Sequence, residues 1–433
     1  MNKPTFVISC PIDTYSGYGA RSRDIVKALI ELDKYDVKIL PQRWGNTPFG
    51  FINDNPEWGF LTKHILQQPQ LPAQPEIWAQ ISVPNEFQPV GKYNIGITAG
   101  IESTVAPAEW VEGCQRMDLI LGSSKHTIDV LRSSKFEKRD QQTNQPMAVV
   151  EWTREGEVLF EGANTEVYKP VKSNFNLPNI KEDFAYLFVG HWIGNTPIGE
   201  DRKNITLLIK AFYETFKNKS KKPALILKTT QVGASYMDRN EIIKRIKAIA
   251  STVSSKNLPN IYLLHGEFTD EEMNSIYNHP KVKAMVSLTK GEGFGRPLLE
   301  FSLTNKPIIT TNWSGHIDYL NPEFTTLLPG QLTNIHPAAA NGMLLKEAQW
   351  FSVDHGHVGH YLKDVFENYK NYTDKAKRQG FQSRTKFSFN AMKEKLDTIL
   401  TQRIPEFPKQ VQLQLPQLKK IELPKLKKVD ANG

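Results

Sequence analysis

Cysteine and long apolar runs are both scarce in this sequence. The chain has 433 residues but only two cysteines, Cys10 and Cys114, and neither their spacing nor their neighbours suggest a metal site. So few cysteines fit a reducing compartment. No run of about twenty apolar residues occurs, so we expect no membrane-spanning segment. The N-terminus lacks the apolar core of a signal peptide and reads as a strand, so we expect a cytoplasmic protein.

Charge and apolar content are both moderate. Apolar residues make up 39% of the chain and aromatic residues 10%, which argues against extensive disorder. A chain of 433 residues exceeds what one hydrophobic core normally supports, so two domains are expected. The formal charge of +8 favours a polyanionic partner, although on a chain of this length that indication is weak.

The stretch from residue 287 to residue 300 combines a strand, a glycine loop and a helix start. Gly291, Gly293 and Gly295 follow the strand and allow the backbone to approach a ligand closely. Pro297 suits the first turn of a helix, where its missing N–H costs nothing. Free amides and the positive end of the helix dipole would point at one spot, which we predict to bind an anion. The alternative is an ordinary strand–turn–helix unit.

Two carboxylates frame this loop. Glu292 comes just before the predicted helix, and Glu300 lies about one turn into it, so both can face the same pocket. Carboxylates accept hydrogen bonds from hydroxyls and repel phosphates. A ligand with a phosphate in its middle and hydroxylated groups at both ends, such as a nucleotide sugar, fits this pattern.

Residues 292–300 resemble the Glu-x7-Glu motif of retaining GT-B glycosyltransferases, and residues 306–320 are similar to that family's next strand and turn. Together with residues 199–204, the motif looks closest to glycosyltransferases encoded by tailed phages. The resemblance implies that Glu292 contacts the donor sugar and Glu300 the ribose. It implies that the diphosphate and sugar are bound by the residues between them, namely Gly293, Phe294, Gly295, Arg296 and Pro297.

The first part of the chain alternates strands and helices, which indicates a parallel sheet. A strand at residues 5–9 is followed by a turn with Gly17 and Gly19 and then by a helix. The turn resembles the glycine loop that opens many GT-B enzymes, although the same turn also occurs merely to pack strand and helix. Glu102 is placed at the carboxyl end of a later strand, where open α/β sheets bind ligands, or else it caps a helix.

Cations are expected near the start of a second domain. A polar loop after the strand at residues 184–190 ends with Arg202 and Lys203, directly before a helix, where both can pair with phosphate oxygens. The GT-B family has an arginine after that strand, but His191 stands there in this chain. Arg202, or Lys228 at the end of the next strand, would then take the place of that arginine.

Other segments are assigned by position. The irregular segment 42–85 is where we expect acceptor contacts, and residues 265–268 are candidates for base recognition. Residues 350–370 and 387–403 are predicted to be amphipathic helices, one of which crosses back to the first domain, as in GT-B enzymes. Three histidines at positions 355, 357 and 360 would diverge on a helix, so no metal site is predicted.

The tail differs from the rest of the chain. Residues 415–422 and 423–430 are two copies of one basic unit in which proline blocks a regular helix. We predict an extended arm, either without a role or in contact with an anionic polymer such as DNA.

The sequence as a whole predicts an α/β protein of GT-B type, with two Rossmann-like domains that face each other across a cleft. The expected domain bounds are residues 1–165 on the acceptor side, a linker at 166–183, a donor domain at 184–375, a crossing helix at 376–403 and a tail at 404–433. The predicted activity is retaining, metal-independent transfer without a cofactor, from a nucleotide sugar, most simply a UDP-sugar. Glu292, Arg202 and Lys203 are the predicted catalytic residues.

The predicted acceptor is a hydroxyl, either on a hydroxymethylated base of phage double-stranded DNA or on a glycan or protein. The motifs describe only the donor, so they fit both. Two further alternatives are a nucleotide-sugar epimerase of GT-B architecture and a binding protein that holds a sugar nucleotide without turnover.

Overall fold

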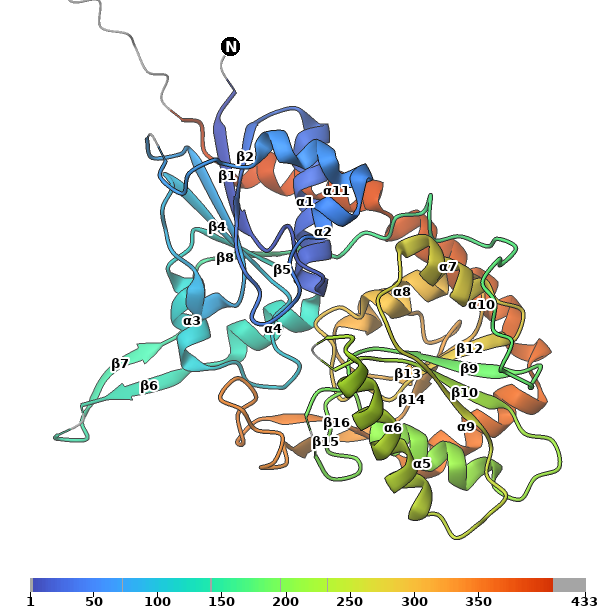
Figure 1. Ribbon diagram of the computed structural model, residues 1–433. Helices are drawn as coiled ribbons and strands as arrows, with labels where there is room; N and C mark the ends of the chain where they lie inside the picture. The colour runs from blue at the N-terminus through green and yellow to red at the C-terminus, as the bar shows by residue number, and fades with distance from the viewer. Residues whose placement is uncertain (1–2, 72, 141, 195, 232, 408–433) are drawn as a thin grey trace, which may run out of the picture.

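The computed structural model describes residues 3–407 except 72, 141, 195 and 232, and the two basic repeats of the tail lie outside this range. The described residues form two α/β domains, each built on a six-stranded parallel sheet (Figure 1). This confirms the predicted fold class. None of the helices in the described ranges is long and apolar enough to cross a membrane.

The first sheet has the strand order β2-β1-β3-β4-β5-β8, and every neighbouring pair is parallel. Its strands are β1 (Thr5–Cys10), β2 (Asp36–Pro41), β3 (Ile77–Ile81), β4 (Tyr93–Thr98), β5 (Leu119–Gly122) and β8 (Glu155–Val158). Its helices are α1 (Gly17–Leu32), α2 (Phe51–Asp54), α3 (Ala108–Gln115) and α4 (Lys125–Ser133), with 3-10 turns η1 (Pro56–His64) and η2 (Pro84–Glu86). An antiparallel hairpin of β6 (Phe136–Arg139) and β7 (Pro146–Val150) extends from this domain (Figure 1).

The second sheet has the order β11-β10-β9-β12-β13-β14 and is also parallel throughout. Its strands are β9 (Ala185–Val189), β10 (Ala224–Lys228), β11 (Ile261–Leu264), β12 (Val282–Ser287), β13 (Ile308–Thr311) and β14 (Thr326–Leu328). Its helices are α5 (Ile205–Phe216), α6 (Tyr236–Ser251), α7 (Asp270–Asn278), α8 (Arg296–Ser302), α9 (His355–Glu367) and α10 (Lys370–Lys386), with a 3-10 turn η3 (Gly315–Asp318). Buried apolar strands with helices on both faces are typical of such sheets.

Local sequence explains why several of these elements begin where they do. Ser16 caps α1 by accepting a hydrogen bond from the Gly19 N–H, and Asp354 caps α9 in the same way through two N–H groups. Thr269 and Glu272 form a reciprocal capping box at the start of α7. Each cap satisfies backbone donors that the first helical turn would otherwise leave free.

One predicted helix begins too early, because its first residues form a strand. Residues 350–370 do not form one helix, because β16 (Gln349–Val353) pairs antiparallel with β15 (Gly330–Asn334) and α9 begins only at His355. Trp350 and Phe351 are both buried but lie in different apolar clusters. Adjacent side chains of a strand point to opposite faces, so one faces the first domain and the other faces the second-domain core.

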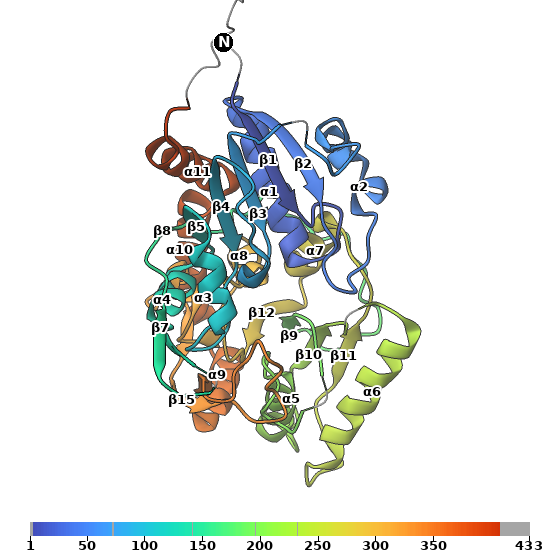
Figure 2. The same ribbon diagram turned by 90° about the vertical axis from the view of Figure 1, so that its left-hand side faces the viewer.

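The chain ends by crossing back to the first domain, as predicted. The segment is two helices, since α10 packs against α8 of the second domain and α11 (Phe389–Arg403) packs against α1 of the first. Met392, Leu396 and Leu400 of α11 are buried in the first-domain core. Figure 2 shows α11 beside the first sheet and α10 below it, next to α8.

The two passages of the chain between the domains are bound to each other. The Ala163 N–H donates to the Phe387 carbonyl at 2.9 Å, and the Phe389 N–H donates to the Ala163 carbonyl at 2.8 Å. Ala163 lies after the last strand of the first domain, Phe387 lies between α10 and α11, and Phe389 is the first residue of α11. The outgoing and returning segments therefore meet at one point.

Candidate active site between the two sheets

The carboxyl ends of the two parallel sheets face each other, with the loop after β12 against the loop after β4 (Figure 2). A Cβ on Gly293 would lie 2.4 Å from the Ala99 carbonyl oxygen, and one on Gly291 would lie 2.6 Å from the Glu102 carbonyl oxygen. The Ser123 hydroxyl also donates to the Gly293 carbonyl at 3.0 Å. Two of the three loop glycines thus make room for first-domain backbone.

The third glycine sets the start of α8. Gly295 has a φ of 90° and directly precedes the helix, which has Pro297 in its first turn. Only glycine adopts this backbone conformation without strain. The Tyr319 hydroxyl donates to the Gly295 carbonyl at 2.6 Å, and the Phe294 ring packs buried against the Tyr319 ring. Phe294 therefore offers a ligand its backbone and not its side chain.

Three successive amides of this loop lack a hydrogen-bond acceptor among the described residues. Within the described part of the chain, the N–H groups of Gly293, Phe294 and Gly295 donate to no protein acceptor. By contrast, the Glu292 N–H donates to the Ser314 hydroxyl at 2.9 Å. Consecutive free amides at a helix start form the kind of site that binds phosphate groups.

Glu292 and Lys203 form a nearly buried ion pair beside these amides. The Lys203 ammonium donates to both carboxylate oxygens of Glu292, at 2.5 and 2.7 Å, and their side chains are 18% and 10% exposed. Burial alone would raise the pKa of Glu292, but Lys203 and then Arg202 outweigh it and hold the pKa below its usual value. Glu292 is therefore ionised and held in place before any ligand arrives.

Arg202 and Glu102 meet across the domain boundary. Arg202 Nη1 lies 2.7 Å from Glu102 Oε1 and 3.4 Å from the Gly291 carbonyl oxygen, to which it donates. The sequence placed both residues at the site but did not predict this contact. The guanidinium lies beside the glycine loop with its charge already balanced by a carboxylate.

Glu300 is paired with Arg296, one helical turn before it. Arg296 Nε donates to Glu300 Oε1 at 2.9 Å, and its Nη1 donates to Asp24 of α1 at 2.6 Å. Glu161 lies 3.9 Å from the same guanidinium. Burial raises the pKa of Glu300 to about 7, and Arg296 only partly opposes this. The carboxylate predicted to bind ribose therefore faces a guanidinium in this structure.

His191 and Lys228 lie on the neighbouring strand ends. His191 Nδ1 is 3.0 Å from both the Thr230 hydroxyl and the Gln231 carbonyl oxygen. Burial lowers the pKa of His191, and the nearby Lys228 and Lys203 charges lower it further. Burial also lowers the pKa of Lys228. His191 and Lys228 therefore place hydrogen-bond donors beside the site, at the carboxyl ends of β9 and β10.

Gly17 and Gly19 of the first domain differ in the space around them. Gly17 opens α1 with no atom within 4 Å of the place where a Cβ would be, whereas a Cβ on Gly19 would lie 2.3 Å from the Thr14 carbonyl oxygen. The Gly19 N–H is already donated to Ser16. Gly19 therefore serves close packing in this structure, and only Gly17 leaves space for a ligand.

A cleft of about 760 Å³ lies between the domains. Aromatic rings of the first domain line one wall, and the start of α7 lines the other. The walls include parts of both segments to which the sequence assigned ligand contacts, at 42–85 and 265–268. The residues that line the cleft include Tyr15, Phe51, Asp54, Glu57, Trp58, Glu267, Phe268 and Glu271.

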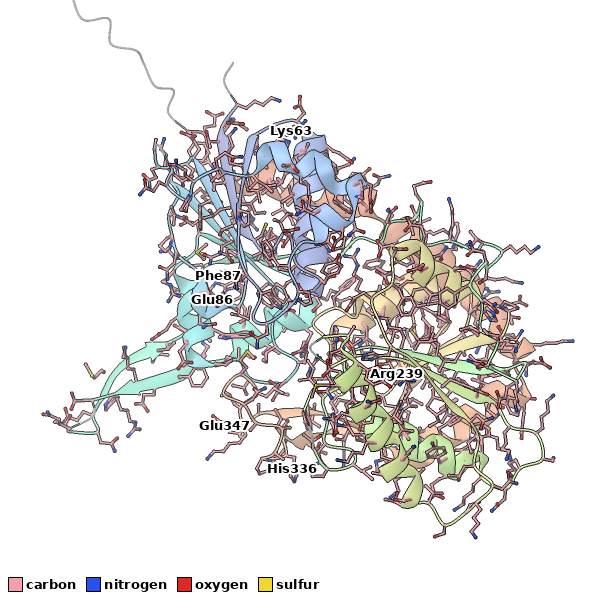
Figure 3. All side chains as sticks on the ribbon, viewed as in Figure 1. Lys63, Glu86, Phe87, Arg239, His336 and Glu347 are labelled. Carbon is pink, nitrogen blue, oxygen red and sulfur yellow. The ribbon has the colours of Figure 1, made fainter. Side chains whose placement is uncertain are left out.

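The hairpin of β15 and β16 makes a second contact between the domains that the sequence did not predict. The Thr104 N–H donates to the Gln349 carbonyl and the Gln349 N–H donates to the Thr104 hydroxyl, both at 2.9 Å. Trp350 shares an apolar cluster with Phe87. Figure 3 labels Phe87 on the first domain and His336 and Glu347 in the facing β15–β16 segment.

Sequence reasoning also missed the first-domain charges that complete the site. Arg21 and Asp24 are both buried on α1, and Glu161 is close to Arg21 and Arg296. A signal was present in the sequence, because Arg21 and Asp24 are three residues apart on the helix face that carries the apolar Ile25 and Ala28. Charged residues on a buried face require partners. Arg21 finds them within the first domain, at the Leu159 carbonyl and Glu161, whereas Asp24 is paired with Arg296 of the second domain.

The fold and its facing strand ends define a two-domain α/β protein of GT-B fold, and solved structures of this architecture match the chain. A glycosyltransferase from Rickettsia africae ESF-5 matches with a TM-score of 0.60 and 13% identity, over 93% of this chain and 99% of that one. Sucrose-phosphate synthase from Thermosynechococcus elongatus gives the same values. Anabaena HepE in complex with UDP and glucose matches with a TM-score of 0.55 and 10% identity, over 92% of this chain and 100% of that one.

At these identities the likeness concerns the fold. No protein-family model matches the chain, and no curated protein sequence matches it either. The GT-B architecture is thus established by structure, while the reaction has to be argued from the residues of the site.

Proposed function

We propose that the protein is a retaining, metal-independent glycosyltransferase that moves a sugar from a nucleoside diphosphate sugar to an acceptor hydroxyl. One observation carries the proposal: the free amides of residues 293–295, the Lys203 ammonium and the Glu292 carboxylate lie together where the two sheets face each other. Amides and an ammonium suit a diphosphate, and a carboxylate suits sugar hydroxyls. HepE, a structural neighbour, binds UDP and glucose, which supports a UDP-sugar donor.

The same residues account for the chemistry. When the bond between the sugar and the diphosphate breaks, negative charge develops on the leaving oxygen. The loop amides, Lys203 and Arg202 would stabilise that charge, so no proton has to come from the enzyme. The acceptor hydroxyl would attack on the face that the diphosphate leaves and give its proton to the departing phosphate oxygen. This route retains the anomeric configuration and uses no enzyme nucleophile.

Glu292 would bind the donor sugar. In the structure its carboxylate is held by Lys203, so donor binding exchanges partners. Lys203 turns to the diphosphate, and the Glu292 oxygens accept hydrogen bonds from sugar hydroxyls. Since the cations are supplied by Lys203 and Arg202, we expect transfer to continue in the presence of EDTA.

The residues that line the cleft indicate which class of acceptor the protein would use. Six carboxylates and one lysine line the cleft beside the rings of Phe51 and its neighbours, namely Asp54, Glu57, Glu267, Asp270, Glu271, Glu272 and Lys27. Such a surface repels a polyanion and suits a neutral hydroxylated molecule that packs against aromatic rings. This favours a glycan or protein acceptor at that end. The hydroxymethylated DNA base predicted from the basic tail remains the other candidate.

The test is release of nucleoside diphosphate from a panel of nucleotide sugars, each with and without hydroxymethylcytosine-containing duplex DNA or a glycan mixture. Release that one class of acceptor stimulates, with sugar found on it in the α configuration for an α-linked donor, would support the proposal. A changed sugar still bound to its nucleotide would indicate an epimerase. Tight binding of nucleotide with no turnover of any donor would indicate a binding protein.

A further inference from the structure

We propose that Glu102 is a built-in competitor of the donor: its carboxylate occupies Arg202 in the free protein and must be displaced before the diphosphate binds. This inference rests on the proposed function, because it concerns the regulation of the same donor site. The sequence placed Glu102 at the strand end as a residue that contacts substrate. The structure assigns it to a cation instead.

The pair has the geometry of a formed ion pair and joins the two domains. Arg202 Nη1 and Glu102 Oε1 are 2.7 Å apart, and the side chains are 30% and 25% exposed. The backbone of Arg202 is fixed as well, because its carbonyl accepts a hydrogen bond from the Lys290 N–H at 2.8 Å. Both partners are thus held beside the glycine loop.

The main chain of Glu102 is anchored beside the glycine loop while the domains stay closed. It is packed against Gly291 so tightly that a Cβ on that glycine would lie 2.6 Å from the Glu102 carbonyl oxygen and 2.9 Å from the Glu102 Cβ. A diphosphate on the loop amides would therefore meet a carboxylate that is anchored next to Arg202. Either the two anions share one guanidinium, or the ion pair breaks because the Glu102 side chain turns away or its domain withdraws.

Both routes make binding of the donor less favourable. Like charges a few ångströms apart repel each other, and a separated ion pair loses its attraction. A partly exposed ion pair contributes on the order of 1 kcal/mol, which corresponds to roughly a fivefold change in a dissociation constant. Glu102→Gln keeps the shape and removes the competing charge.

A hydrogen bond between the domains that involves neither guanidinium offers a control. The Lys125 N–H of α4 donates to the Asp318 carboxylate of η3 at 2.7 Å. Asp318→Ala removes this contact between the domains without freeing Arg202 or Arg296. A gain in affinity caused merely by looser domains would appear in both variants. A gain caused by competition would appear only in Glu102→Gln.

The experiment is calorimetric titration of the full-length protein with UDP, and with GDP and dTDP in parallel. We expect Glu102→Gln to bind its preferred nucleotide about three to ten times more tightly than the wild type, Asp318→Ala to show no such gain, and Arg202→Gln to bind more weakly. In the Arg202→Gln background, the Glu102→Gln change should have a clearly smaller effect, because the ion pair that competes with the diphosphate is already absent and only the repulsion between the two anions remains.

Two results would overturn the inference. One is unchanged or weaker nucleotide binding in Glu102→Gln, and the other is an equal gain with and without Arg202. Both leave the proposed function intact, because nucleotide still binds. If neither the wild type nor Glu102→Gln binds any of the three nucleotides, the proposed function fails, and this inference fails with it.

Discussion

Arg296 of the glycine-loop helix donates to Asp24 of α1 at 2.6 Å, so one guanidinium joins the donor loop to the first domain. The same guanidinium holds Glu300 at 2.9 Å. The position of the first domain is therefore coupled, through this one side chain, to the hydrogen bonding of Glu300, the residue predicted to bind ribose. Any motion that separates Asp24 from Arg296 also changes what Glu300 faces.

Removal of either partner of this pair should destabilise the protein. Arg296→Gln leaves Asp24, Glu161 and Glu300 without their shared cation, so we expect a loss of about 3 kcal/mol in the free energy of unfolding. Asp24→Asn should cost less, because two carboxylates remain on Arg296. Urea unfolding of both variants and of the double variant gives the coupling energy. A coupling energy near zero would show that the contact contributes nothing in solution.

Glu300 should make stability fall as pH rises. Its pKa is about 7 in the folded protein, against an ordinary 4.5, so the folded protein keeps a proton that the unfolded chain releases. The unfolding free energy therefore decreases from about pH 4.5 to about pH 7, by about 3 kcal/mol in total, and then levels off. Glu300→Gln should lack this decrease.

The pH test compares unfolding of Glu300→Gln with that of the wild type between pH 4.5 and 8. The unfolding free energy of Glu300→Gln minus that of the wild type should increase from pH 4.5 to about pH 7 and stay constant above it. Glu394→Gln, on the exposed face of α11, is the matched control and should run parallel to the wild type throughout. Parallel curves for Glu300→Gln would mean that Glu300 keeps an ordinary pKa.

Glu292→Gln should separate turnover from binding. The variant cannot accept hydrogen bonds from sugar hydroxyls as a carboxylate does, so we expect kcat for transfer to fall about a hundredfold or more. Nucleotide affinity should not fall and should rise somewhat, because Lys203 no longer has to leave a carboxylate to reach the diphosphate. Initial rates and UDP titrations measure the two effects. An unchanged kcat would remove Glu292 from the catalytic residues.

Lys203→Met should weaken both stability and nucleotide binding. It leaves the nearly buried Glu292 carboxylate without its ammonium, which costs about 3 kcal/mol in unfolding free energy. It also removes a cation from the diphosphate, so the dissociation constant for UDP should rise about tenfold or more. The double variant with Glu292→Gln should recover much of the stability but not the affinity. Recovery of both would argue against contact between Lys203 and phosphate.

Gly293→Ala should abolish activity, whereas Gly17→Ala tests a different role. The added methyl of Gly293→Ala would lie 2.4 Å from the Ala99 carbonyl oxygen, so the loop or the first domain must shift. At Gly17 the methyl meets nothing within 4 Å and sits in a helix. If Gly17→Ala folds normally but loses nucleotide affinity, its backbone approaches the ligand. If it behaves like the wild type, the glycine is not required for binding.

Much of the candidate site could be located from the sequence because each part lies in one short segment. The strand, the glycine loop and the helix start at 287–300 are local features, and so are Arg202 and Lys203 before α5. Parallel strands bring their carboxyl ends to one edge, so segments far apart in sequence, such as those of Lys203 and Glu292, meet there. The fold class followed from the same alternation of strands and helices.

The remaining features depend on the other domain. Glu102 and Arg202 were each placed at the site, but their pairing requires the relative position of two sheets, which no local pattern encodes. The strand at Trp350 was missed for the same reason, since its burial depends on a first-domain cluster. Gly19 is a different case. It lies in a strand–turn–helix pattern that the sequence linked to ligand binding, but in the structure it serves close packing against Thr14, and the pattern alone does not distinguish the two roles.

The hydrogen bonds between Ala163 and residues 387 and 389 have a mechanical consequence. Two separate tethers would let the domains slide, twist and bend independently. Tethers joined at one point leave mainly a swing about that point, with the smallest travel near Ala163 and the largest at the opposite rim of the cleft. Domain opening in this protein should therefore be a rotation about this point, in which the rim of the cleft farthest from Ala163 moves most.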